Sequence, residues 1–220
     1  MASLLLALTL LAFALGVALQ RRLRSPLLNP TLIAVLLLIG LLLALRTSYA
    51  TYADATRPLS ALLTPAVVAL AVPMYRQRDL LVRQWRALIL GGMMGTLTAM
   101  AVGWLGGALL HLERGSQLAL LTASATSPVA LAVAQRLGGA PPLAAALAIW
   151  AGLVGATVLP ALLSKLGVRS PLARGVAVGG TSHGIGTAHL REEGDLAGAA
   201  SSLGMGLGAL VVTLAASLLR

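Results

Sequence analysis

The chain has 220 residues, of which 58% are hydrophobic, 10% are charged and none is cysteine. Soluble domains average roughly 45–50% apolar and about 25% charged residues, so a soluble fold of this length would lack polar surface. The apolar content excludes intrinsic disorder. The absence of cysteine excludes disulfide scaffolds, thiolate metal sites and cysteine nucleophiles. The composition therefore predicts an integral membrane protein.

Eight long intervals without charge divide the chain. About 20 apolar residues in a helix cross a hydrocarbon core of about 30 Å. Most intervals are long enough to cross once, and none is long enough to cross twice. We predict an all-α polytopic helical bundle with seven or eight hydrophobic segments, forming one transmembrane domain over residues 1–220. The intervals are 1–20, 25–45, 58–75, 87–112, 115–135, 137–164, 175–190 and 196–219.

The first interval has the charge order of a transmembrane helix. A secretory signal peptide carries its positive charge before the apolar stretch, whereas Arg21, Arg22 and Arg24 follow the stretch here. We therefore expect the carboxyl end of this helix to face the cytoplasm. Asn29 and Pro30 are typical of a helix start, and open the second segment.

The net charge of +10 comes from cations in short turns between apolar runs. Nucleic-acid binding would require a basic stripe on one folded face, whereas loop cations follow the positive-inside rule of membrane proteins. If all eight segments cross, nine cations lie on one side and seven on the other. If residues 115–135 enter and leave on the same side, the division becomes eleven against five. The charges thus favour one re-entrant element in the second half.

Two segments share a sequence pattern. Residues 68–72 read Val-Ala-Leu-Ala-Val and follow Thr64-Pro65, and residues 129–133 repeat this pentapeptide after Ser127-Pro128. Chance similarity in a chain rich in Ala, Leu and Val is the alternative. Proline removes a backbone donor and breaks helices. We predict two discontinuous or re-entrant segments, compatible with an inverted repeat.

Broken helices at membrane depth point to a binding site. Their free backbone groups need neighbours or a water-filled cavity. Secondary transporters place such breaks near the midplane, where helix amino termini face anionic solutes. Residues 122–128, Thr-Ala-Ser-Ala-Thr-Ser-Pro, supply four hydroxyl groups around one break.

A second polar stretch covers residues 179–187, which contain four glycines and His183. Each glycine costs about 1 kcal/mol in a helix interior, and ionisable groups inside a membrane are functional candidates. Close helix packing is the alternative, and it suits Gly204, Gly206 and Gly208 better, because no polar side chain intervenes there. The candidate substrate-binding residues are Thr126, Ser127, Pro128, Thr181, Ser182, His183, Gly184, Gly186 and Thr187, and Thr64 and Pro65 mark a second broken helix.

Enzymatic chemistry has little support. Ser182 and His183 are adjacent and point in different directions on a helix, and no acid is placed to orient the histidine. The acids Asp79, Glu113, Glu192, Glu193 and Asp195 fall in expected loops. We expect no catalytic residue, no metal site and no cofactor.

Several stretches resemble the LrgB/CidB family of bacterial membrane proteins, from about residue 29 to the end. The most specific stretch is Ser-His-Gly-Ile-Gly-Thr, which begins at Ser182. The other matching stretches are residues 173–188, 198–203, 29–30, Tyr49 with Tyr52, 63–75 and 126–130. The resemblance implies a multi-pass protein of the bacterial inner membrane.

Two functions attach to this family. One is transport of small monocarboxylates such as pyruvate, with glycolate and glycerate carried by the related plastidial protein. The other is antiholin-like regulation of murein hydrolase activity and cell lysis, with a small LrgA/CidA-type partner. We expect a transporter that works by alternating access and binds a small organic anion in the lipid bilayer. The sequence does not give the coupling ion, and His183 is the residue that could carry a coupled proton. A homo-oligomer is compatible with either function, and nucleic acid is not expected as a partner.

One position departs from the family pattern. The family usually carries Pro-Lys-Ser before its Thr-Thr-Pro turn, whereas this chain has Thr122-Ala123-Ser124. A lysine that would pair with a substrate carboxylate is therefore replaced by Ala123. Anion binding would instead depend on backbone N–H groups, hydroxyls and His183, or on Arg174 if it reaches inward.

Overall fold

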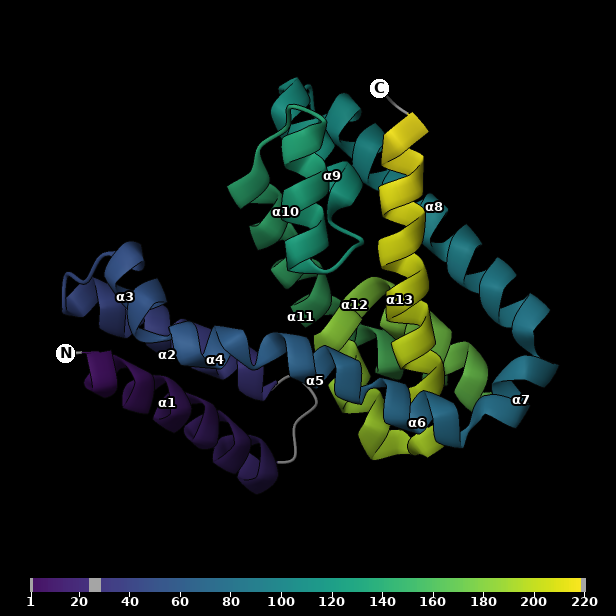
Figure 1. Ribbon diagram of the computed structural model, residues 1–220, viewed down its shortest axis with the longest axis horizontal. Helices are drawn as coiled ribbons and strands as arrows, with labels where there is room; N and C mark the ends of the chain where they lie inside the picture. Colours follow the sequence, from purple (N-terminus) through teal and green to yellow (C-terminus); the bar gives the residue numbers. More distant parts are fainter. Residues whose placement is uncertain (1, 24–28, 219–220) are drawn as a thin grey trace. The chain divides into compact units, whose positions relative to one another are not determined.

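The computed structural model describes residues 2–23 and 29–218, and all their regular secondary structure is helical. Two compact units divide the chain, Met1–Ala69 and Leu70–Arg220, and their elements are labelled in Figure 1. Within the described residues, five helices are long and apolar enough to cross a membrane: Ala2–Leu23, Arg57–Arg76, Trp85–Leu109, Pro141–Lys165 and Asp195–Leu218. The prediction of an all-α polytopic membrane fold is confirmed.

The first unit contains α1 (Ala2–Leu23), α2 (Pro30–Ala44), α3 (Tyr49–Ala55), α4 (Arg57–Ala61) and α5 (Leu63–Ala69). Asn29 caps α2 as predicted, because its side chain accepts hydrogen bonds from the N–H groups of Thr31 and Leu32 at 2.8 and 3.3 Å. Gly16 allows α1 to pack closely against the start of α2, since a Cβ on Gly16 would lie 2.5 Å from the Pro30 carbonyl oxygen.

Thr64 and Pro65 lie in the first turn of α5. The helical path over residues 57–76 is interrupted by single turn residues at Leu62 and Leu70, and α6 (Ala71–Arg76) follows. The interruption at Leu62 places Pro65 in the first turn of α5. A proline is tolerated there, because the backbone N–H groups of a first turn have no helical partners.

The second unit has three spans, α8 (Trp85–Leu109), α11 (Pro141–Lys165) and α13 (Asp195–Leu218), and the short helix α7 (Arg78–Arg83). Between α8 and α11 lie two short helices, α9 (Arg114–Thr122) and α10 (Ser127–Arg136). The chain returns to its starting level, because the Ala140 N–H donates to the Gly115 carbonyl at 3.3 Å. Residues 114–136 therefore form a re-entrant pair, here called the first hairpin, as the charge distribution predicts.

Helix α12 (Pro171–Glu193) is also a hairpin, here called the second hairpin. His183 breaks it with φ 49° and ψ −132°, a backbone conformation that is uncommon for a residue with a side chain. The two ends meet again, because the Arg174 guanidinium binds the Glu193 carboxylate at 2.7 Å. Interval 175–190 therefore enters and leaves at one level, as the first hairpin does.

The two hairpins enter from opposite ends of the second unit. The first hairpin leads directly into the start of α11, and the second hairpin follows the end of α11. Because α11 is one continuous span, the bases of the two hairpins lie at opposite ends of it. The bases of the two hairpins are therefore at opposite membrane faces, and both tips lie in the interior of the membrane.

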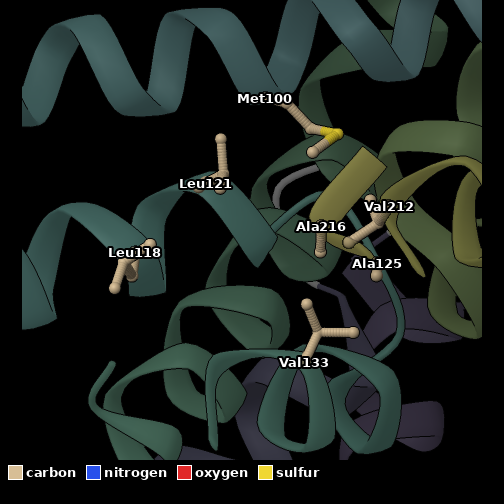
Figure 2. Close-up of a cluster of buried hydrophobic side chains, with 7 residues drawn as sticks. All are labelled: Met100, Leu118, Leu121, Ala125, Val133, Val212 and Ala216. Carbon is tan, nitrogen blue, oxygen red and sulfur yellow. The ribbon is translucent and has the colours of Figure 1, made fainter. Parts of the chain in front are cut away.

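Small and aliphatic side chains hold the hairpins among the spans. Figure 2 shows one cluster in which α8, the first hairpin and α13 contribute Met100, Leu118, Leu121, Ala125, Val133, Val212 and Ala216. On its other side the first hairpin packs against α11 through Ala119, Ala130, Ala134, Ala144 and Ala148. The second hairpin packs between α11 and α13 through Val178, Leu190 and Ala197. Alanine and glycine allow the close backbone approach that membrane helices require.

Eight of the ten arginine and lysine residues of the described part of this unit lie at one end of its helices. This basic end contains Arg76, Arg78, Arg83, Arg86, Lys165, Arg169, Arg174 and Arg191, and the opposite end contains Arg114 and Arg136. The positive-inside rule predicts that the basic end faces the cytoplasm.

Single cysteines test this topology cleanly, because the chain has none of its own. We expect Ser116→Cys and Gln135→Cys to react with a membrane-impermeant thiol reagent from the same side, and Leu166→Cys to react from the other side. Leu166 is the matched reporter because it is exposed at the basic end. Labelling of Ser116→Cys and Gln135→Cys from opposite sides would contradict the first hairpin.

Candidate functional site

The tips of the two hairpins meet inside the second unit. Residues 123–126 form the turn between α9 and α10, and His183 forms the tip of the second hairpin. The His183 ring lies against the backbone of Ser124, and both residues are more than nine-tenths buried. The two polar stretches found in the sequence are therefore joined, through Ser124 rather than through Ser127.

Three buried polar atoms at this junction have no hydrogen-bond partner among the described residues: Thr96 Oγ1, Ser124 Oγ and His183 Nε2. Their residues, here called the polar cluster, come from α8, the first hairpin and the second hairpin. Helix α13 borders the cluster at Gly208, since Thr96 Oγ1 and the Ser124 carbonyl oxygen lie 3.5 and 3.7 Å from the point where a Cβ on Gly208 would be. Buried polar groups in proteins are nearly always paired, so such a cluster marks a place for water or a polar solute.

A cleft of about 570 Å³ leads toward this cluster. Its walls are α8 and the first arm of the second hairpin, with Leu159 from α11, and its residues run from Gln84 and Ser170 at the basic end to Thr96 and Thr181. The glycines Gly91, Gly92 and Gly95 line the α8 wall. Polar groups thus occur at the inner end of a largely apolar passage.

Thr96 is the site residue that the sequence did not reveal. It is one of two threonines in a 25-residue apolar helix, where a threonine usually donates to its own helix. The neighbouring glycines of α8 were the sequence signal that could have indicated this site. A helix face lined by glycines has no side chains to fill the space between it and the next helix.

Three residues of the second polar stretch stabilise the hairpin itself. The Ser182 side chain is fully buried against Gly155 of α11. Gly186 packs against Val178 and Ser182, where a Cβ would lie 2.5 Å from the Ser182 Cβ. Thr187 Oγ1 donates to the His183 carbonyl at 2.7 Å and lies 2.9 Å from Ser201 Oγ of α13. These contacts hold the strained tip in place.

The remaining candidates lie near the tips. Thr126 precedes α10 and makes no side-chain cap, and Ser127 and Pro128 form the first turn of α10. Thr181 lines the cleft and donates to the Ala177 carbonyl at 2.8 Å, and Gly184 is exposed beside His183. The amino terminus of α10 leaves backbone N–H groups without helical acceptors.

Arg174 does not reach inward. Its Nε and Nη2 atoms donate to the two carboxylate oxygens of Glu193 at 2.8 and 2.7 Å, and Nη1 donates to Ser164 Oγ at 3.0 Å. The hydrogen bond from Arg174 lowers the pKa of Glu193, which lies at the base of the second hairpin, at the membrane surface. The expectation that the acids lie in loops is wrong for four of them: Asp79 is in the first turn of α7, Glu192 and Glu193 end α12, and Asp195 begins α13. An anion at the polar cluster therefore has no help from Arg174.

The polar cluster contains no permanent charge. All ten arginine and lysine residues of the described second unit lie near the ends of its helices or between them. The five acidic residues of this unit, Asp79, Glu113, Glu192, Glu193 and Asp195, also lie at helix ends. The only titratable side chain at the hairpin tips is His183.

Residues 9–220 match the LrgB-like family. The chain belongs to this family. It is 33% identical over 204 residues to YxaC, an uncharacterised protein of Bacillus subtilis, an alignment that covers 93% of this chain and 89% of YxaC. An uncharacterised protein of Haemophilus influenzae is 32% identical over 209 residues, which are 95% of this chain and 90% of that protein. The resemblance seen in the sequence is confirmed.

A third relative carries a functional name. The antiholin-like protein LrgB of Bacillus subtilis is 27% identical over 156 residues, covering 71% of this chain and 68% of LrgB. No solved structure matches the chain. The LrgB-like family and the apolar spans establish a multi-pass membrane protein.

Proposed function

We propose that this protein transports small monocarboxylates of the pyruvate or glycolate type across the inner membrane by alternating access. The observation that carries the proposal is the meeting of two oppositely directed broken helices at three buried polar atoms that have no partner in the described part of the chain. Discontinuous helices of this kind bind solutes near the midplane in secondary transporters.

The chemistry of the tips suits a small anion. The amino terminus of α10 at Ser127 and the arm that begins after His183 present free backbone N–H groups and a partial positive charge. Ser124 and Thr96 add hydroxyl donors. A carboxylate held by N–H and O–H groups does not require the lysine that Ala123 replaces.

The cleft supports access from one face. Its volume of about 570 Å³ exceeds what a three-carbon acid needs, and its inner end lies at Thr96 and Thr181. Because the two hairpins enter from opposite ends, movement of one or the other gives the solute an exit to either side. The basic end, predicted to be cytoplasmic, is where the cleft begins.

Uptake into proteoliposomes tests the proposal. We expect saturable uptake of radiolabelled pyruvate or glycolate by the wild type, and at least a tenfold loss of uptake in Thr96→Val and in His183→Ala, because each removes an unpaired polar atom from the cluster. Thr157→Val is the matched control, since its hydroxyl donates to Leu153 within α11 at 2.7 Å and it is not in the cleft. Absence of saturable uptake in the wild type would overturn the proposal.

Antiholin-like regulation of murein hydrolases and lysis is the second candidate function. The name of the LrgB relative favours it and suggests an LrgA/CidA-type partner. Altered lysis can also follow from altered metabolite transport. Cells that carry Thr96→Val separate the two functions: normal control of lysis without uptake would favour the antiholin-like function.

A further inference from the structure

Beside the polar cluster, oxygen atoms from three elements face the same side of Gly208. Thr96 Oγ1, the Gly180 carbonyl oxygen and the Ser124 carbonyl oxygen lie 3.5, 3.6 and 3.7 Å from the point that a Gly208 Cβ would occupy. No heavy atom beyond the helix itself lies closer to that point. The absence of a side chain on Gly208 therefore leaves a small space surrounded by oxygen.

The two carbonyl oxygens belong to the carboxyl-terminal sides of the two broken helices. Ser124 follows the end of α9 at Thr122, and Gly180 lies in the last turn before the break at His183. The last carbonyl groups of a helix carry a partial negative charge and lack helical partners. Each hairpin tip thus presents N–H groups on one side of its break and carbonyl groups on the other.

Carbonyl oxygens suit a cation and repel a carboxylate, whereas a hydroxyl group can accept a cation on its lone pairs or donate to an anion. Thr96 Oγ1 and Ser124 Oγ are buried and unpaired among the described residues, so both have lone pairs available. Divalent cations in proteins are held by carboxylates as well as neutral oxygens, and every acid of the described second unit lies at a helix end. Neutral oxygens alone favour a monovalent cation.

We propose that Thr96, Ser124 and Gly180 bind a sodium ion in the space beside Gly208. Hard cations take oxygen ligands at about 2.3–2.6 Å, roughly 1 Å closer than these oxygens lie to the reference point. The ion supplies the positive charge that the polar cluster lacks. Coupling of this ion to a carboxylate rests on the proposed transport function, whereas binding of the ion itself does not.

Melting of the purified full-length protein in detergent tests the site, with Trp85, Trp104 and Trp150 as fluorescent reporters. At equal ionic strength and fixed pH, we expect a higher Tm in sodium chloride than in potassium chloride or choline chloride. Equilibrium dialysis with ²²Na⁺ gives a second measurement that does not depend on unfolding.

Gly208→Ala is the decisive variant. Its methyl group would make ordinary contacts of 3.5 Å or more, so it fits sterically, and it fills the proposed ion space. Alanine favours the helix over glycine, so the variant is expected to fold and to bind sodium at least tenfold more weakly. Gly206→Ala is the matched control on the same helix, because nothing lies within 4 Å of its Cβ position, and it should keep the sodium response.

Two results would overturn the proposal: equal Tm in the three salts with no retained ²²Na⁺, or an unchanged sodium response in Gly208→Ala. Loss of the response in Gly208→Ala alone supports it. Sodium binding without any carboxylate uptake would leave the ion site intact and remove the transport function. Carboxylate uptake that does not depend on sodium, together with no ²²Na⁺ binding, would remove the ion site and leave the transport function intact.

Discussion

Replacing Gly179 with alanine is expected to prevent normal packing of the second hairpin on α13 and to lower the Tm by several degrees or more. A Cβ at this position would collide with the backbone of Ser201, including its carbonyl oxygen. Backbone atoms cannot move aside as a flexible side chain can, so α12 and α13 would have to separate. Overpacking of this kind costs about 1–3 kcal/mol and occasionally more.

Gly184→Ala is the matched control for stability, because it lies in the same helix and has no atom within 4 Å of its Cβ position. We expect its Tm to stay within a few degrees of the wild type. The measurement is thermal unfolding in detergent, with gel filtration to detect misfolded protein. Equal Tm values for the two variants would show that the Gly179 contact is not tight in the folded protein.

Loss of the Arg174–Glu193 ion pair is expected to produce the second large effect. The Arg174 and Glu193 side chains are 12% and 28% exposed, and this pair joins the two arms of the second hairpin. The pair is only partly shielded from solvent, but its two parallel hydrogen bonds are charge-assisted, and we expect Arg174→Met to destabilise the protein by about 1–2 kcal/mol. The double variant Arg174→Met with Glu193→Leu should recover part of this loss, because it leaves no carboxylate without a partner.

The control for this variant is Arg78→Met at the same end of the molecule. Arg78 and Asp79 are separated by 3.9 Å and are 54% and 84% exposed. Exposed pairs of this kind contribute little, so the Tm should change only slightly. A similar loss of Tm in Arg78→Met and Arg174→Met would contradict the role of the hairpin pair.

The pH dependence of stability follows from the same ion pair. The pKa of Glu193 is lowered from its ordinary value of 4.5 by the hydrogen bond from Arg174. A carboxylate with a lowered pKa stabilises the folded state above its unfolded pKa, and this contribution is lost as the pH falls through the folded pKa. The Tm of the wild type should therefore fall more steeply below about pH 4.5 than that of Glu193→Gln. Parallel curves would show that the pair contributes nothing.

The sequence was sufficient to predict a polytopic helical membrane protein and its family. Apolar intervals of membrane length can be counted directly, because crossing a bilayer imposes a minimum length on every span. The re-entrant first hairpin followed from the positions of Arg136, Lys165 and Arg174, since loop cations follow membrane orientation. The second hairpin was recognised only as a polar, glycine-rich interruption.

Which polar residues face one another depended on the tertiary structure. Ser182, Gly186 and Thr187 shared one stretch with His183, yet they contact Gly155, Val178 and Ser201. Thr96 came from a distant helix without a distinctive motif. The sequence by itself determined where the apolar segments lie and near which stretches their helices are interrupted, because length, proline and glycine act locally. Only the tertiary structure decided that Thr96, Ser124 and Gly180 approach one point beside Gly208, with His183 against Ser124, because contacts between distant segments depend on how the two hairpins pack among the spans.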